Sequence, residues 1–447
     1  MNRIFKKFKD ITLNPPLVLT IGFGILIFIG SLLLNMGFFT KSGESIGYID
    51  ALFTAGSASC VTGLTVVNTA THWNFWGHLV IITLIQVGGL GIMTLAILFP
   101  MVMRKRIGLT TRQIIREQLN VETLSGMVKL LKYVIFFTFA LEIIGAIIMS
   151  MEFVPTYGLK KGIWFSIFHS ISAFCNAGFD ITGDSMAPFQ NSLPINVSII
   201  SLVVIGGLGF QVSSEFISKK SIKKLSVHDK LVLTMTGILI IGGAVIFYLI
   251  ENTNPDTLKG VETFPKIIQS LFQSVITRTA GFYSVDTSRI RDTSAVLMII
   301  LMFIGGSPGS TAGGLKTTTF GVLLASMIAT IRGHESVVIF KKRIPNSVIL
   351  KALALVMISI FLVIGISFIL TITEEHTFLD ILFEVTSAYA TVGLTRGITT
   401  GLTDVGKLII TLTMYIGRIG PLTMAFAFGK GSKNSKLDYP DANISVG

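Results

Sequence analysis

Eight long apolar segments are the feature that most constrains how this chain can fold. They cover residues 17–38, 76–103, 131–151, 194–217, 231–250, 294–330, 350–372 and 405–429. A helix needs about 20 apolar residues to cross a bilayer, and each segment reaches that length. The chain is 51% hydrophobic and only 13% charged, unlike an ordinary soluble domain. The sequence therefore predicts an all-α membrane protein with eight transmembrane segments.

The distribution of Lys and Arg predicts the orientation of these segments. Basic residues concentrate at the amino end (Arg3, Lys6, Lys7 and Lys9), in residues 104–132, 219–230 and 332–351, and in the carboxyl tail. Most acidic residues lie in the opposite loops. By the positive-inside rule, we expect both termini in the cytoplasm and a multi-pass membrane protein in contact with lipid. The net charge of +12 is then a topology signal, and no nucleic-acid partner is expected.

A short, semi-apolar stretch lies between the two members of each successive pair of long segments. At about 10–14 residues, these stretches are too short to span and are typical of re-entrant helices. Each leads to a glycine that is followed by a large apolar residue, and the glycines recur about 110 residues apart, at Gly63, Gly178, Gly281 and Gly393. The chain is therefore predicted to contain an internal fourfold repeat.

Each repeat is read as membrane helix, short pore helix, extended glycine segment and second membrane helix. The predicted boundaries are 1–104, 105–218, 219–332 and 333–429, followed by a cytoplasmic tail, 430–447. The residues before the glycine agree in three repeats, beginning with Phe53, Phe168 and Phe383. The third repeat departs, with Leu271 in the place of the phenylalanine, and it alone is predicted to have a broken second helix.

The glycine segments have the chemistry of a cation filter. A monovalent cation that enters the membrane must exchange water for oxygen ligands, and backbone carbonyls supply them without fixed charge. Glycine lets four such segments approach one axis, and the carboxyl ends of the short helices would add a partial negative potential. The predicted potassium-binding filter comprises Val61, Thr62, Gly63, Asn176, Ala177, Gly178, Thr279, Ala280, Gly281, Thr391, Val392 and Gly393. Arg278, beside the third segment, is expected to point away into an ion pair.

With these four segments, and with Gln86-Val-Gly-Gly-Leu-Gly91 and Gly417-Arg-Ile-Gly-Pro421, the chain resembles the Trk/Ktr/HKT family of potassium transporters. It is most similar to the membrane subunit of bacterial Ktr systems, which implies a location in the bacterial plasma membrane. The resemblance implies potassium uptake through one pseudo-fourfold pore. It also implies a homodimer seated on a cytosolic ring of nucleotide-binding, RCK/KTN-type subunits, with sodium as a candidate activator. In related plant proteins a serine at the first filter glycine accompanies sodium preference, so Gly63 favours potassium.

The glycine-rich stretch of the third repeat interrupts an apolar run. The resemblance implies that this stretch forms an intramembrane gate below the filter and that the arginine of the fourth repeat helps to hold it. Carried over to this chain, the gate is Gly305, Gly306, Ser307, Gly309, Ser310, Thr311, Gly313, Gly314 and Lys316, with Arg418 as its partner. Two alternatives stay open: Lys316 could extend to the cytoplasmic interface, and Arg418 could be a structural tie without a gating role.

The same stretch superficially resembles a phosphate-binding loop. That motif needs a glycine directly before the lysine and a strand before the loop, whereas here Leu315 intervenes after a membrane segment. We therefore expect no cofactor on this chain, with ATP or ADP bound by the partner subunit and potassium as the substrate. Cys60 and Cys175 are expected to be packing residues.

Two other functions compete with the channel-like pore. A sodium-coupled secondary transporter would also have broken helices, usually paired between inverted halves. A membrane enzyme would need an acid/base pair or a metal set at membrane depth. Only Glu142 and Glu215 are acidic within or near the helices, so no catalytic residues are predicted.

Overall fold

The computed structural model describes residues 15–91, 127–219, 221–421 and 423–424. The basic amino end, most of the 104–132 stretch and the 430–447 tail lie outside the described residues. Apart from β1 (Val338–Ile339) and β2 (Lys342–Arg343), which pair as an antiparallel hairpin, the regular elements described are helices. The predicted all-α class is confirmed.

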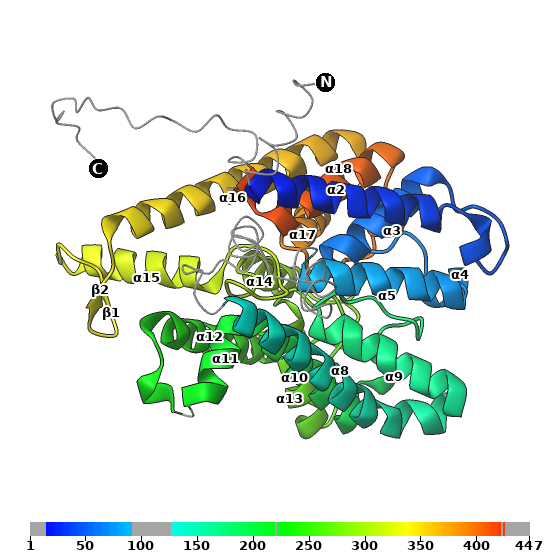
Figure 1. The fold of residues 1–447 in the computed structure, drawn as a ribbon, viewed down its shortest axis with the longest axis horizontal. Coiled ribbons are helices and arrows are strands. Elements are labelled where there is room, and N and C mark those ends of the chain that lie inside the picture. The colour runs from blue at the N-terminus through cyan, green and yellow to red at the C-terminus, as the bar shows by residue number, and fades with distance from the viewer. Residues whose placement is uncertain (1–14, 92–126, 220, 422, 425–447) are drawn as a thin grey trace.

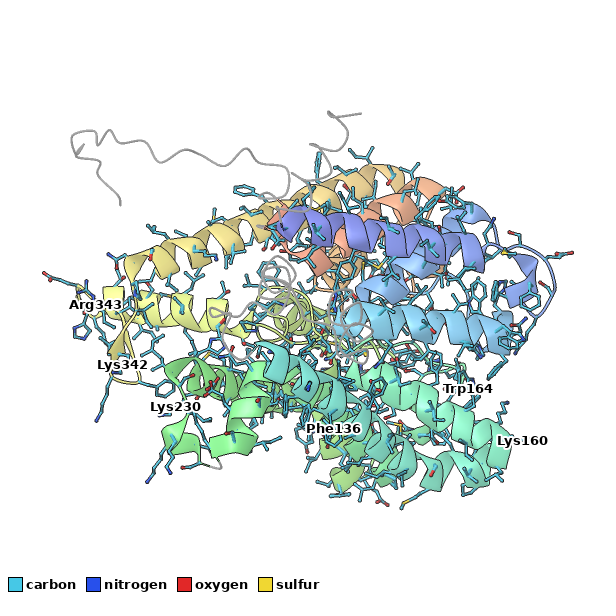
Figure 2. All side chains as sticks on the ribbon, in the orientation of Figure 1. Phe136, Lys160, Trp164, Lys230, Lys342 and Arg343 are labelled. Atoms are coloured by element: carbon cyan, nitrogen blue, oxygen red, sulfur yellow. The ribbon has the colours of Figure 1, made fainter. Side chains whose placement is uncertain are left out.

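Four long apolar helices form the outside of the molecule. They are α2 (Pro15–Leu34), α8 (Met127–Tyr157), α12 (Val227–Glu251) and α16 (Asn346–Thr373), and each is long enough to cross a membrane. Their outward faces are apolar: Phe136, Phe361 and Phe368 are 78%, 69% and 67% exposed, and Figure 2 shows Phe136 on such a face. An exposed surface of this kind suits contact with lipid rather than water.

Each long helix is followed by a short helix and then by a second helix. The short helices are α3 (Tyr48–Cys60), α9 (Leu159–Phe174), α13 (Thr263–Ile276) and α17 (Phe378–Tyr389). The second helices are α5 (Phe75–Leu90), α10 (Leu193–Leu208), α14 (Asp292–Phe303) and α18 (Asp404–Ile419). The connecting segments contain η1 (Gly37–Phe39), α4 (Thr69–His72), η2 (Ala187–Phe189), η3 (Ile222–Lys224) and η4 (Thr399–Gly401). The predicted order of helices thus occurs four times.

Local sequence signals explain where several of these helices begin. The Ser226 side chain accepts a hydrogen bond from the Asp229 N–H, and the Asp229 carboxylate accepts one from the Ser226 N–H, which forms a capping box at the start of α12. Thr377 and Thr403 likewise accept from backbone N–H groups in the first turns of α17 and α18. Such caps satisfy amide groups that a helix start leaves without partners.

The four groups of helices close into a ring. Each second helix packs against the short helix of the next group, α5 on α9, α10 on α13 and α14 on α17, and α18 packs on α3 to complete the circle. In Figure 1, α2–α5 (blue) and α16–α18 (orange and red) lie together on one side, and α8–α13 lie on the other. The short helices therefore surround a common centre.

A glycine with positive φ follows three of the second helices. Gly91, Gly209 and Gly420, which follow α5, α10 and α18, have φ values of +84°, +95° and +90°, a conformation that side chains disfavour. After Gly209 the chain turns by 98° into α11 (Phe210–Lys219). In the third group, residues 304–316 separate α14 from α15 (Thr317–Ile331). The prediction that only the third repeat has a broken helix is therefore wrong.

The third short helix reaches its glycine with one residue fewer than the others. The N–H groups of Thr62, Ala177 and Val392 each donate to a carbonyl five residues earlier, on Ser57, Ser172 and Ser387, whereas Ala280 donates to Ile276, four residues earlier. Phe272 consequently occupies the place of Phe53, Phe168 and Phe383, and all four rings are fully buried. The prediction that placed Leu271 there is corrected by this one-residue deletion.

Candidate functional site

Each short helix ends in a three-residue segment with the same unusual backbone. The first residue is left-handed, at Val61 (φ 59°), Asn176 (60°), Thr279 (69°) and Thr391 (52°). The third is the glycine of the repeat, at Gly63 (99°), Gly178 (68°), Gly281 (67°) and Gly393 (91°). The left-handed conformation of a non-glycine residue costs about 1–2 kcal/mol of conformational free energy. Strain of this kind often occurs at functional sites, and here it occurs in all four segments.

Serines of the short helices accept hydrogen bonds from backbone N–H groups of the first and fourth segments. Thr62 N–H and Gly63 N–H donate to the carbonyl and hydroxyl oxygens of Ser57, at 2.8 and 3.1 Å. Val392 and Gly393 do the same with Ser387, at 2.8 and 3.0 Å. The N–H groups of the first and fourth segments are therefore bound by a serine of the short helix that precedes them.

The four glycines, here called the glycine ring (Gly63, Gly178, Gly281 and Gly393), lie against one another. A methyl group at Gly393 would overlap the Thr62 carbonyl oxygen, and one at Gly63 would overlap that of Ala177. A methyl group at Gly178 would lie 2.6 Å from Ala280 O, and one at Gly281 would lie 2.7 Å from Val392 O. The structure thus brings all twelve residues predicted for the filter together, in cyclic order and with no room for a side chain at the glycines.

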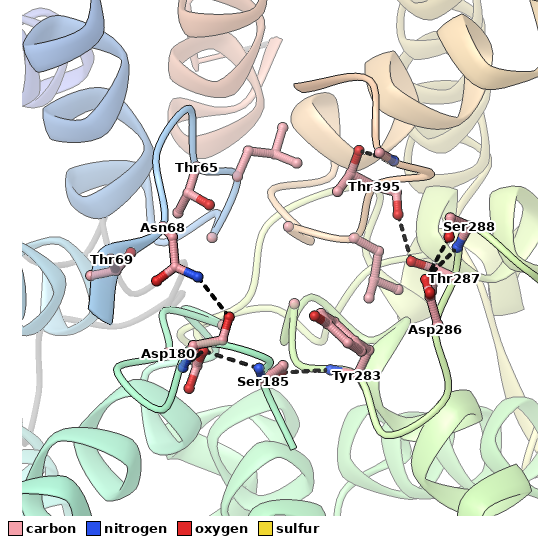
Figure 3. Close-up of a pocket in the computed structure, with 18 residues that line it drawn as sticks. Thr65, Asn68, Thr69, Asp180, Ser185, Tyr283, Asp286, Thr287, Ser288 and Thr395 are labelled. Atoms are coloured by element: carbon pink, nitrogen blue, oxygen red, sulfur yellow. Dashed lines mark hydrogen bonds between the residues drawn. The ribbon is translucent and has the colours of Figure 1, made fainter. Parts of the chain in front are cut away.

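A cavity of about 260 Å³ opens on one side of the glycine ring. Figure 3 shows that its polar lining comes from all four groups of helices, including Asn68, Asp180, Asp286 and Thr395. Hydrogen bonds join neighbouring groups: Asn68 donates to Gly183 O at 2.9 Å, and Tyr283 N–H donates to Ser185 Oγ at 3.0 Å. Carboxylates and carbonyls at such a mouth favour cations.

At this cavity, several hydrogen bonds stabilise the negative charge of the Asp180 carboxylate. Its carboxylate accepts hydrogen bonds from the N–H groups of Thr182, Gly183 and Ser185 and lies 3.1 Å from His169 Nε2. Burial raises the pKa of Asp180, but the hydrogen bonds and charge of His169 and the bonds from Thr182 outweigh it, and the pKa lies below its ordinary value. The carboxylate is therefore ionised at neutral pH, and its contribution to stability is lost only as pH falls through this lowered pKa.

The stretch predicted to form the gate, Gly305–Lys316, lies within residues 304–316, here called the glycine-rich loop, on the opposite side of the ring from the cavity. A methyl group at Gly313 would overlap the Thr391 hydroxyl. Loop N–H groups also donate to the end of α10, Ser307 to Gly207 O at 3.0 Å and Thr311 to Gly206 O at 3.3 Å. The loop therefore fills the space between α10 and the inner side of the glycine ring.

Three cationic side chains, of which Arg278 is buried and Lys316 and Arg418 are partly buried, hold this loop through carbonyl oxygens. Arg278 donates to Ile304 O at 2.9 Å, and Lys316 donates to Ala312 O at 2.9 Å. Arg418 donates to Thr311 O, and to Gly88 O and Gly89 O at the end of α5. Among the described residues, no ion pair includes any of the three. The expectation of an ion pair for Arg278 is therefore wrong, and Lys316 folds back on its own loop.

Sequence reasoning missed the hydroxyl groups that support the filter backbone. Ser57 and Ser387 accept from the glycine N–H groups, and Ser172 donates to Phe179 O at 2.9 Å. These serines lie six residues before their glycines, so the repeat contained the signal. Cys60 and Cys175 are free and buried, as expected of packing residues.

The two acidic side chains that a membrane enzyme could have used do not form a pair. Glu142, on α8, accepts a hydrogen bond from Gln86 Nε2 at 2.9 Å. Glu215, on α11, forms an ion pair with Lys219 one turn away. Neither Glu142 nor Glu215 is among the residues that line the glycine ring cavity.

Comparison with known proteins agrees with this architecture. The TrkH family model, described as "Cation transport protein", matches residues 7–437. The chain is 42% identical to the potassium/sodium uptake protein NtpJ of Enterococcus hirae, over 99% of this chain and 100% of that protein. It is 44% identical to the Ktr system potassium uptake protein B of Bacillus subtilis, over 99% of each.

The fold also matches a crystal structure of the potassium transporter TrkH from Vibrio parahaemolyticus. The TM-score is 0.73 at 19% identity, and the match covers 92% of this chain and 84% of that one. The ring of short helices, the family match along nearly the whole chain and these similarities lead to one conclusion. This chain belongs to the TrkH family of cation transport proteins and is a multi-pass membrane transporter, not an enzyme.

Proposed function

We propose that this chain takes up potassium through a channel-like pore at the centre of its four repeats. The observation that carries the proposal is the glycine ring, in which the carbonyls of Thr62, Ala177, Ala280 and Val392 each approach the glycine of the neighbouring repeat. Such carbonyls can replace the hydration shell of potassium. The names of both relatives, each an uptake protein for potassium, support the choice of ion.

The glycine-rich loop is the gate of this pore, with Arg418 as the side chain that holds it closed. Two contacts support this assignment: Gly313 packs against Thr391 of the fourth filter segment, and Arg418 ties Thr311 to the end of α5. A cation that leaves the filter toward the cytoplasm would meet this loop. Transport then requires the loop to move aside, which is a local conformational step.

Replacing Gly63 with serine tests the filter. The side chain would overlap the Ala177 carbonyl, at a residue whose φ is +99°, so the ring must widen or lose a ligand. We expect the potassium-to-sodium permeability ratio to fall several-fold, measured by tracer flux of the purified protein in liposomes under an imposed potential.

The matched control is Gly260→Ser. Gly260 also has a positive φ, +87°, but it has no atom within 4 Å of an added methyl group. An unchanged permeability ratio in Gly63→Ser, in protein that folds like the control, would refute the filter assignment.

A sodium-coupled secondary transporter is the second candidate. The 98° bend between α10 and α11 favours it, because discontinuous helices in two repeats are a feature of such transporters. The name of the Enterococcus relative, which includes sodium, points the same way. Uphill potassium accumulation in liposomes driven by a sodium gradient alone would establish coupling, whereas a pore allows only downhill flux.

We also propose that a cytosolic nucleotide-binding subunit regulates this chain. The words "Ktr system" in the name of a relative support a partner subunit. Lys230, Lys342 and Arg343 gather at one end of the molecule, far from Lys160 and Trp164 (Figure 2). This basic end is the proposed cytoplasmic face and the docking surface for a ring of partner subunits beneath a homodimer. Pull-downs at rising salt test the electrostatic part, since exposed charge contacts weaken with ionic strength. The mass of the purified protein in detergent tests the dimer.

A further inference from the structure

Asn176 differs from the three other left-handed residues that begin the filter segments, Val61, Thr279 and Thr391. Its carboxamide is fully buried and bonds to other parts of the chain. Nδ2 donates to Arg278 O at 3.1 Å and approaches Val203 O at 3.4 Å, while Oδ1 lies 2.9 Å from the Thr311 hydroxyl. Because carbonyl oxygens only accept, the amide orientation is determined by its partners. The Thr311 hydroxyl is then the donor to Asn176.

Thr311 is the residue through which the glycine-rich loop contacts the Asn176 side chain. It is fully buried, and its hydroxyl lies between Asn176 Oδ1 and Phe174 O, at 2.9 and 3.3 Å. Its carbonyl accepts from Arg418. Gly206 makes this approach possible, because a methyl group there would lie 2.7 Å from Asn176 Oδ1 and 3.1 Å from Thr311 Oγ1.

Arg278 provides a second connection between filter and loop. Its carbonyl accepts from Asn176, and its guanidinium donates to Ile304 O, where α14 ends and the loop begins. The second and third filter segments are thus joined to each other through the Asn176 amide. They are also joined to the loop at two places, Thr311 and Ile304.

We propose that Asn176 and Thr311 form a latch that couples the position of the glycine-rich loop to the ion selectivity of the filter. The inference rests on the proposed pore and gate. When the loop moves aside, the Thr311 hydroxyl leaves Asn176 Oδ1, a buried acceptor that then lacks its donor. Asn176 is free to turn, and its bond to the Arg278 carbonyl beside the third filter segment is no longer fixed. Opening the gate therefore lowers discrimination between potassium and sodium.

The test compares Thr311→Val with Thr311→Ser in the purified full chain in liposomes. Valine keeps the shape but removes the donor, whereas serine keeps the donor. We expect Thr311→Val to lower the potassium-to-sodium permeability ratio on the order of fivefold, the factor that one hydrogen bond of ordinary strength is worth. Thr311→Ser should retain the ratio of the unaltered chain. Thr413→Val is the matched control, because Thr413 is equally buried but its hydroxyl bonds within α18, to Ile409 O.

The possible results test the latch and the pore separately. A Thr311→Val protein whose permeability ratio matches the unaltered chain overturns the latch, whatever its total flux. Absence of potassium flux from the unaltered chain instead overturns the proposed pore. In the Asn176→Ala background, Thr311→Val should have almost no further effect on the ratio, because the partner is already gone. A full additional fivefold fall there would show that Thr311 acts independently of Asn176.

Discussion

In the layer of the glycine ring, the four repeats place the same kind of residue in the same conformation, a left-handed residue followed two positions later by a glycine. In the layer beneath it, where the second helices end, three repeats again share a closely packed glycine. Gly88, Gly206 and Gly417 each pack so closely on a short helix that a methyl group would overlap a backbone carbonyl, on Ser59, Phe174 and Tyr389 respectively.

One residue further along, the repeats of this lower layer diverge. Gly89 and Gly207 follow in the first two repeats, whereas Arg418 follows in the fourth and extends to the first and third repeats. The Gly207 carbonyl accepts from the loop residue Ser307. In the proposed pore, the segments that would contact a spherical ion are thus repeated four times, whereas the loop proposed as its gate occurs once, on a shared scaffold.

Gly393→Ala should break the ring layer and have the largest effect. The methyl group would overlap Thr62 O, and φ is +91°, so the backbone strain of about 1–2 kcal/mol adds to a steric conflict at the centre. We expect potassium flux in liposomes to fall by roughly two orders of magnitude or more, since the conflict far exceeds the strain alone. Gly260→Ala imposes similar strain in open space and should transport normally. Equal flux from the two variants would mean that the ring is wider than described.

Arg418→Gln tests the lower layer and should have the opposite sign. It weakens a charge-assisted tie to Thr311, Gly88 and Gly89 carbonyls, and such bonds contribute roughly 1.5–3 kcal/mol. If the tie favours the closed loop by about 2 kcal/mol, basal flux rises about thirtyfold, measured without any partner protein. Flux at or below that of the unaltered chain, in correctly folded protein, would identify Arg418 as a structural tie only.

Ser57→Ala sharpens the comparison with a smaller change. The Gly63 N–H loses its acceptor at 3.1 Å, and a buried donor without a partner costs about 1–3 kcal/mol. Thermal unfolding in detergent should show destabilisation of about 1 kcal/mol, together with a reduced potassium-to-sodium ratio. Ser59→Ala is the control two residues away, because the buried Ser59 hydroxyl has no hydrogen-bond partner. A similar loss in both variants would argue against a specific role for Ser57.

Arg396→Gln should have the smallest effect. Arg396 joins the third and fourth repeats outside both layers, with bonds to Asp292 at 2.9 Å and Asp380 at 3.1 Å. Asp292 is largely exposed, and pairs of this kind contribute about 0–1 kcal/mol. Flux and permeability ratio should change less than twofold. A large change in either would show that the outer loops also stabilise the proposed filter.

The sequence alone predicts those features of the two layers that depend on residues close together in the chain. The glycines of the ring are recognisable because close approach and positive φ tolerate no side chain, and that requirement recurs in each repeat. The bend at Gly209 had the same local cause but was not predicted, because the apolar run continues through it from residue 194 to 217. Hydropathy does not record that the chain turns.

Other features depend on contacts between residues far apart in the chain. Arg278 bonds to a carbonyl 26 residues away, and Asn176 bonds to Thr311, 135 residues away; neither pairing has a periodicity that a sequence displays. The Phe272 position was misjudged because alignment on the glycine assumed four short helices of equal reach. A single deletion inside one repeat is visible only once the hydrogen-bond register is known.

The closure of the ring by α18 on α3 has a consequence for how the protein is made. Lys407 is paired with Asp50, 357 residues earlier, and Tyr415 donates to Thr20 O, 395 residues earlier. During synthesis, the first segment of the glycine ring can contact the fourth only after nearly the whole chain has left the ribosome. An interrupted polypeptide lacks the fourth segment, so on the proposed function it has no complete pore and is not expected to conduct potassium.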